Sequence, residues 1–336
     1  MENGPQIRTI GNASERQKEQ SKNILKERLF SHFDSLLQRD RDELQRFEYP
    51  KSETVVALID FANKETSRLM EEINIEPYDV PVENYHIVLE EFYKRVVGNN
   101  SNAIAHTSEQ GMLFNGRKFE GNHVHFGAVA IHETLHLKAH LSLEVSETNG
   151  TVSTSNYRRG VKVGSLQEHS DVGMYHEHFK GLDEAIVATQ EKKSLERLLE
   201  VPQLTKEKEW MLSDSAKQLK KELSAQKGVS EGDIIWVDEK NYEIVSYPKQ
   251  RETLQFICSE IQIQFPEQYK NSDDVFNEFL KSHFTGKLLP IARLVERTFG
   301  EGSFRLLGNM DTDKSSGVLH LESFKKARMR QLRSKE

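Results

Sequence analysis

The chain has 336 residues, enough to bury a sizeable core and to form one large domain or two smaller ones. A formal net charge of −7 argues against a general nucleic-acid-binding protein, because such proteins need a basic surface to displace counterions. We expect no membrane span and no signal peptide, since no apolar run is long enough and the N-terminus is polar. The single cysteine excludes an intramolecular disulfide framework and favours a reducing, cytoplasmic location.

The first hundred residues have a helical pattern. Residues 1–14 are polar and are expected to be disordered. Residues 15–100 are expected to form a helical N-terminal segment, because apolar residues recur at three- and four-residue spacings. The pattern predicts helices over residues 14–46, 53–73 and 82–97, with prolines between them.

The pattern changes at Asn102, so residues 101–200 are expected to form a separate central unit. Two short strands are predicted over residues 103–107 and 111–114. A strongly apolar helix is expected next, over residues 124–145, and another over residues 180–199.

Residues 201–336 are expected to be mostly helical, with a β-hairpin near residues 233–246. The alternation of helical stretches with a few short strands predicts an α+β fold. We expect it to be mostly helical, with a small mixed sheet beside the apolar helix of the central unit.

The apolar helix carries the sequence His132-Glu133-Thr134-Leu135-His136. Four residues span about one helical turn, so both imidazoles leave the same face and can reach one Zn2+. Glu133 adjoins the first histidine, where its carboxylate can take a proton from a water that the metal activates. The spacing therefore predicts a catalytic zinc site with His132 and His136 as ligands and Glu133 as the general base.

A catalytic zinc site needs a third protein ligand, and the best candidate is Glu184 in Gly181-Leu182-Asp183-Glu184-Ala185. With this segment the chain resembles the gluzincin branch of the zincin metallopeptidases, in which a glutamate on a downstream helix completes the ligand set. The resemblance covers residues 102–199 and implies a zincin-like catalytic core. Some gluzincins place an aspartate four residues after the ligand to orient the first histidine. Ala188 occupies that position, so we expect Asp183 to supply the carboxylate that orients the histidine instead.

His140 is an alternative third ligand, because it lies four residues after His136. A straight helix turns its ring away by about 40° and moves it about 6 Å along the axis, which makes Glu184 the better candidate.

The resemblance also implies a side chain that stabilises the oxyanion of the reaction. Tyrosines and histidines between the two helices are candidates for this role, namely Tyr157, Tyr175, His176 and His178. The strands before the motif helix suggest an edge that pairs with an extended peptide.

The sequence therefore predicts a zinc-dependent metallopeptidase with one Zn2+ per chain and a peptide or protein substrate. Two alternatives stay open. The first is a catalytically silent, zinc-binding zincin that acts as an interaction module through its helical flanks. The second is a metal-free helical adaptor in which the motif is accidental.

Overall fold

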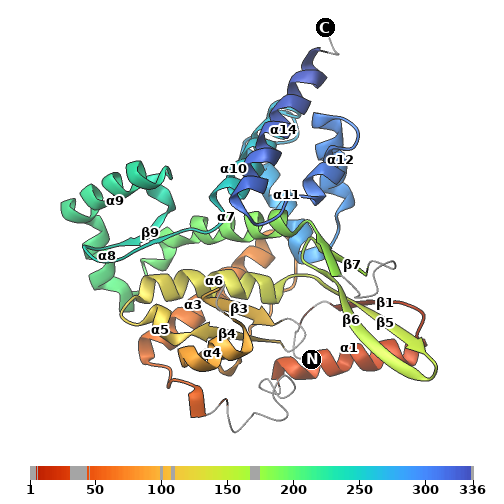
Figure 1. The fold of residues 1–336 in the computed structure, drawn as a ribbon, viewed down its shortest axis with the longest axis horizontal. Helices are drawn as coiled ribbons and strands as arrows, with labels where there is room; N and C mark the ends of the chain where they lie inside the picture. The colour runs from red at the N-terminus through yellow and green to blue at the C-terminus, as the bar shows by residue number, and fades with distance from the viewer. Residues whose placement is uncertain are drawn as a thin grey trace. The chain divides into compact units, whose positions relative to one another are not determined.

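The computed structural model describes residues 5, 7–30, 44, 46–98, 101–106, 110–166 and 175–333. The fold is α+β (Figure 1) and divides into two compact units, each assembled from separated stretches of chain. Unit 1 comprises Met1–Pro5, Glu15–Lys138 and Gln190–Val245, and unit 2 comprises Gln6–Ser14, Ala139–Thr189 and Ser246–Glu336. The four consecutive segments expected from the sequence stay a prediction.

Unit 1 contains a three-stranded mixed sheet in the order β2-β4-β3. The two expected strands are confirmed as β3 (Ala103–His106) and β4 (Gly111–Asn115), which pair antiparallel. β2 (Tyr85–Val88) pairs parallel with β4 and corrects the helix expected over residues 82–97, of which only α4 (Glu90–Val96) is an α-helix. All four residues of β2 are buried, so its position depends on a partner strand later in the chain that local periodicity cannot reveal.

The helix α6 (His123–Lys138) packs beside α3 (Glu53–Glu72), which confirms the expected second helix (Figure 1). The mixed sheet also packs against α6, since Tyr85 Oη lies 2.9 Å from Thr134 Oγ1 and the rings of Phe114 and Phe126 are 5.3 Å apart. A small mixed sheet therefore lies beside the motif helix, as expected.

The motif helix ends earlier than expected. Residues 141–145 were expected to belong to this helix, but residues 141–148 form the strand β5 (Leu141–Thr148). The helix ends at Lys138, and the backbone N–H of His140 then donates to the carbonyl of His283 at 3.0 Å. Apolar residues of a buried strand resemble those of a buried helix in composition, which explains the error.

In the rest of unit 1, α1 (Glu15–Phe30) covers the first part of the helix expected over residues 14–46, and residues 31–43 lie outside the described residues. The expected hairpin is confirmed as β9 (Ile234–Val237) paired antiparallel with β10 (Tyr242–Ile244). The other helices of this unit are α5 (Gly116–Phe119), α8 (Thr205–Leu212) and α9 (Asp214–Lys227).

Unit 2 contains a five-stranded sheet in the order β1-β5-β6-β7-β8. Its later strands are β6 (Thr151–Arg159), β7 (Lys162–Leu166) and β8 (Tyr175–His178), all antiparallel to their neighbours. β1 (Ile7–Ile10) pairs parallel with β5, which corrects the disorder expected for this part of residues 1–14. The buried Ile7 holds this strand in place although its surroundings in the sequence are polar.

The helices of unit 2 pack on one another around buried aromatic rings. Figure 1 shows α10 and α14 side by side, and their contact is extensive. These helices are α10 (Pro248–Gln264), α11 (Ser272–Thr285), α12 (Leu289–Phe299), α13 (Ser303–Gly308) and α14 (Lys314–Arg333). Within the described ranges, no helix combines the length and the apolar character that a membrane span requires.

Candidate metal centre

Two helices carry the candidate site. α6 presents His132, Glu133 and His136, and α7 (Lys180–Leu198) presents Glu184, which confirms the helix expected over residues 180–199. α7 is one uninterrupted helix whose second half belongs to the same unit as α6.

A glycine allows α7 to approach α6 closely. A Cβ atom at Gly127 would lie 2.7 Å from Cδ1 of Leu198 and 3.3 Å from Cδ2 of Leu58, both too short for ordinary contacts. The missing side chain therefore leaves room for Leu198, the last residue of α7, against the motif helix.

The side chains of His132, His136 and Glu184 lie together and form a group that could hold a metal ion. Each offers one ligand atom, and these atoms all lie within 4.8 Å of one another. His136 and Glu184 are buried, and only 12% of the His132 side chain is exposed. Two imidazoles and one carboxylate are the donors of a known class of catalytic zinc site with three protein ligands. The residues thus fit a zinc ion by donor type and by proximity.

The carboxylate that orients His132 is Glu191. Its Oε2 lies 2.8 Å from Nδ1 of His132, and its side chain is almost fully buried. A carboxylate on Nδ1 leaves Nε2 as the nitrogen that can bind a metal. Glu191 was not among the site residues predicted from the sequence. The available signal was its position seven residues after Glu184, which puts both carboxylates on the same face of α7.

Asp183, which was expected to orient a histidine ligand, is fully buried and contacts other groups. Its Oδ1 accepts a hydrogen bond from the Val161 N–H at 3.0 Å and lies 2.9 Å from Nδ1 of His283. Its Oδ2 lies 3.3 Å from Nζ of Lys162, and the same Nζ lies 3.3 Å from Oε1 of Glu184. Asp183 therefore supports the ligand group through Lys162, whereas Glu191 has the role we expected of Asp183 on His132.

The turn between β6 and β7 lets Asp183 reach these groups. Gly160 occupies the left-handed region at φ +60°, and a Cβ atom there would lie 2.3 Å from Oδ1 of Asp183. Glycine relieves the strain of this conformation and leaves space for the buried carboxylate.

Glu133, the predicted general base, is buried beside the two histidines in the sequence and shares its surroundings with Tyr93. Burial raises the pKa of Tyr93 to about 12, and the charge of Glu133 contributes to the rise, while a hydrogen bond with Ser101 opposes it. The phenol is therefore protonated at neutral pH. Its hydroxyl oxygen lies 2.9 Å from Oγ of Ser101, and the sequence did not single it out.

His140, the alternative third ligand, has a different environment. Its Nε2 lies 2.9 Å from Oγ of Ser142. Burial lowers the pKa of His140 to about 4, and nearby positive charge such as that of Arg158 lowers it further. The group that could hold a metal ion, among the described residues, contains Glu184 and does not contain His140.

The four candidate oxyanion stabilisers lie in the sheet of unit 2. Tyr157, on β6, lines a cavity together with Lys162. His178, on β8, lies opposite Val163. Tyr175 and His176 belong to the backbone of β8, but their side chains lie outside the described residues. Their role in stabilising an oxyanion stays a prediction for all four.

Comparison of the chain with protein-family models, curated proteins and solved structures gave no match. The residues of the site are therefore the basis for its chemistry. They define an α+β protein with two histidines and a glutamate grouped as a possible metal centre.

Proposed function

We propose that the protein is a zinc-dependent hydrolase of the peptidase type. The observation that carries the proposal is the grouping of His132, His136 and Glu184 within 4.8 Å, on helices whose contact is fixed independently by the Glu191–His132 hydrogen bond. Burial of these polar side chains costs free energy unless each finds a partner, and one metal ion would be a common partner for all three.

The position of each residue in the site determines the role that we propose for it. A zinc ion held by the three ligands would supply Lewis acidity towards both a water molecule and a peptide carbonyl. Glu133 takes the proton of the attacking water and passes it to the leaving amine. Glu191 keeps His132 in the tautomer that binds metal through Nε2.

The edge strand β3 is the proposed place for an extended substrate. β3 pairs with β4 on one side, and it has no further strand partner among the residues that the structure describes. A free edge can add a peptide as one more strand through backbone hydrogen bonds. Hydrogen exchange of the β3 amides should slow when a peptide binds, and unchanged exchange would remove this part of the proposal.

The Lys162–Glu184 contact favours a second candidate function, a metal-free protein in which the same residues form a structural cluster. In that case the ammonium of Lys162 satisfies Glu184, and Glu191 satisfies His132. The protein would then act through its surface. The two functions differ in zinc content, because a structural cluster has no need of a metal ion.

The proposed hydrolase is tested by digesting a peptide library with zinc-loaded protein and with the Glu133→Gln variant. The wild type should cleave at defined positions, and loss of the general base should slow cleavage by about 100- to 10,000-fold. Glu120→Gln is the matched control, since Glu120 is exposed and lies outside the site. Equal cleavage by Glu133→Gln and by the wild type would remove Glu133 from the mechanism.

A further inference from the structure

The helix α14 of unit 2 has one buried face and one exposed face. On the buried face, the hydroxyl of Thr253 on α10 donates to the carbonyl of Gly317 at 3.1 Å. Further along, Nε of Arg328 lies 2.8 Å from Oε2 of Glu260. A Cβ atom at Gly317 would lie 2.7 Å from Cβ of Lys249, so the glycine lets the two helices approach closely. These contacts hold α14 in place and leave its opposite face in solvent.

The exposed face carries a row of aliphatic side chains. Val318, Met329 and Leu332 are 42%, 58% and 49% exposed. Three helical turns contain about 11 residues, so Val318 and Met329 lie on the same side of the helix, and Leu332 follows about one turn later. Contact with an apolar phase would remove this surface from water, which is favourable.

A row of cations lies beside the aliphatic row. Lys326, Arg330 and Arg333 are exposed and follow one another at spacings of four and three residues, so they are neighbours on the helix surface. Glu322 is the only acidic residue in the sequence of α14, and its Oε1 lies 3.0 Å from Nζ of Lys325. Within the described ranges, no ion pair involves the three exposed cations. Their charge is therefore available to an anionic partner.

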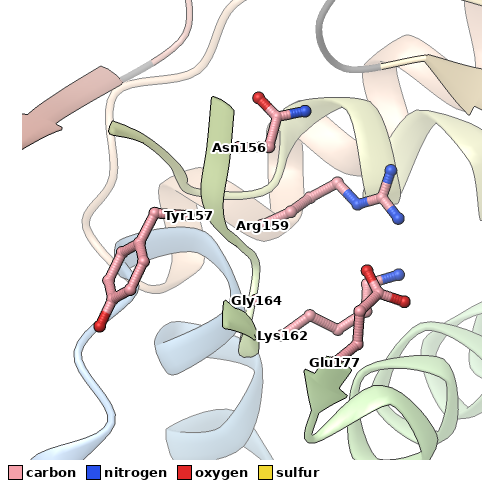
Figure 2. A pocket seen from close by; sticks show the side chains of 6 residues that line it. All are labelled: Asn156, Tyr157, Arg159, Lys162, Gly164 and Glu177. Carbon is pink, nitrogen blue, oxygen red and sulfur yellow. The ribbon is translucent and has the colours of Figure 1, made fainter. Parts of the chain in front are cut away.

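The cations on the sheet of unit 2 have a different environment. In the cavity shown in Figure 2, Nζ of Lys162 lies 3.3 Å from carboxylate oxygens of both Asp183 and Glu184. Glu177 lines the same cavity as Arg159. Carboxylates of the protein accompany these cations, whereas those of α14 face solvent beside apolar side chains.

We propose that the exposed face of α14 binds an anionic lipid surface. Lys326, Arg330 and Arg333 pair with the phosphate and carboxylate groups of the lipid headgroups. Met329 and Leu332 enter the boundary between headgroups and acyl chains, as apolar residues of interfacial helices do. The aliphatic stems of the lysine and arginine side chains are buried there, while their charges stay among the headgroups.

The size of the exposed face favours a lipid surface over an acidic protein. α14 has 20 residues, and its contact with α10 occupies part of them. A stable protein–protein interface takes about 20–30 residues from each partner, which is more than this face supplies. A lipid surface needs no complementary groove. Figure 1 shows the end of α14 extending past α10, which leaves the end with Met329 and the cations accessible.

Cosedimentation of the full chain with lipid vesicles tests the proposal. The probes are vesicles of phosphatidylcholine alone and vesicles in which phosphatidylserine supplies about one third of the lipid. The wild type should sediment with the anionic vesicles and stay in solution with the neutral ones. Added salt should release it, because salt screens the attraction between the cations and the headgroups.

The variant Lys326→Gln/Arg330→Gln/Arg333→Gln tests the contribution of charge. It should lower the partition constant roughly 100-fold, since each cation near an anionic surface contributes about fivefold. The matched control removes three exposed charges of unit 2 that lie outside α14 and should bind like the wild type. It is the variant Lys281→Gln/Lys287→Gln/Arg293→Gln.

The variant Met329→Ser/Leu332→Ser tests the apolar contact. It should lower the partition constant about 10- to 100-fold, because two aliphatic side chains no longer leave water. Thermal unfolding should match that of the wild type, since both side chains are exposed. Unchanged binding of this variant would overturn the proposal, because charge alone would then explain the sedimentation.

Other results would also overturn it. One is a folded wild type that stays in solution with the anionic vesicles. Another is an equal loss of binding in the control and in the variant without the three α14 cations. Binding of soluble poly-glutamate through these cations, without binding of vesicles, would replace the lipid surface by an acidic protein.

Discussion

Oε2 of Glu191 lies 2.8 Å from Nδ1 of His132 and ties the second half of α7 to the motif helix. Glu184 lies on the same face of α7, two turns earlier, so one helix supplies both a candidate ligand and the carboxylate that orients another ligand. The contact fixes the tautomer of His132 and raises the basicity of its other nitrogen.

Replacing Glu191 with glutamine should weaken zinc binding by about 10- to 100-fold, because an amide orients and polarises the imidazole less well than a carboxylate. Competition with a chelator of known affinity measures the change. Glu196→Gln, an exposed position on the same helix, is the control and should bind zinc like the wild type. Unchanged affinity in Glu191→Gln would show that the contact has no influence on a metal.

His125 should make the protein less stable in acid. Nδ1 of His125 lies 3.4 Å from Oε1 of Glu243, but burial dominates and lowers the pKa of His125 to about 4. The unfolded histidine has the ordinary pKa of 6.5, so the unfolded state binds more protons as the pH falls below that value. The free energy of unfolding should drop by up to about 3 kcal/mol between pH 6.5 and pH 4 from this residue alone.

Denaturant unfolding at several pH values measures this effect. His125→Gln removes the titrating group, so its stability should fall less steeply between pH 6.5 and pH 4 than that of the wild type. His123→Gln is the control, because it removes a half-buried histidine two positions away on the same helix and leaves His125 in place, so the slope assigned to His125 should remain. If the unfolding free energies of the wild type and His125→Gln fall in parallel with pH, His125 is excluded as the cause of the acid destabilisation.

Gly127 should tolerate no branched side chain. Gly127→Val places methyl groups where Leu198 packs, and overfilling of this kind costs about 1–3 kcal/mol of unfolding free energy. Leu198→Ala removes the obstructing atoms, so the cost of Gly127→Val should be smaller in that background. Thermal or denaturant unfolding of the two single variants and the double variant measures the coupling, and strictly additive costs would place the strain elsewhere.

The sequence predicted those parts of the fold that depend on the local pattern of apolar, polar and turn residues. The helix over residues 53–73, the strands of residues 103–107 and 111–114, and the hairpin near residues 233–246 follow from periodicity and turn residues. β1 and β2 were missed because each pairs parallel with a strand far along the chain, and such pairing leaves no local signal.

The residues of the candidate site also divide into those that local pattern predicted and those that depend on distant contacts. His132 and His136 follow from helical spacing, and the structure groups them with Glu184, which the resemblance had suggested. Glu191 was missed because it acts on a residue 59 positions away in sequence, and only the packing of α7 on α6 brings the two together. Lys162 lies on β7 and contacts Glu184 of α7, 22 residues away in sequence, which spacing along one helix cannot indicate.

The zinc content of the purified protein tests the central claim most directly. Elemental analysis of the wild type should find about one zinc per chain, and His136→Ala and Glu184→Gln should lose most of it, since each removes one of three protein ligands. Glu196→Gln should keep the metal. Wild-type protein that contains no zinc and takes up none on adding Zn2+ would contradict the metal centre and leave the metal-free cluster as the explanation of the site.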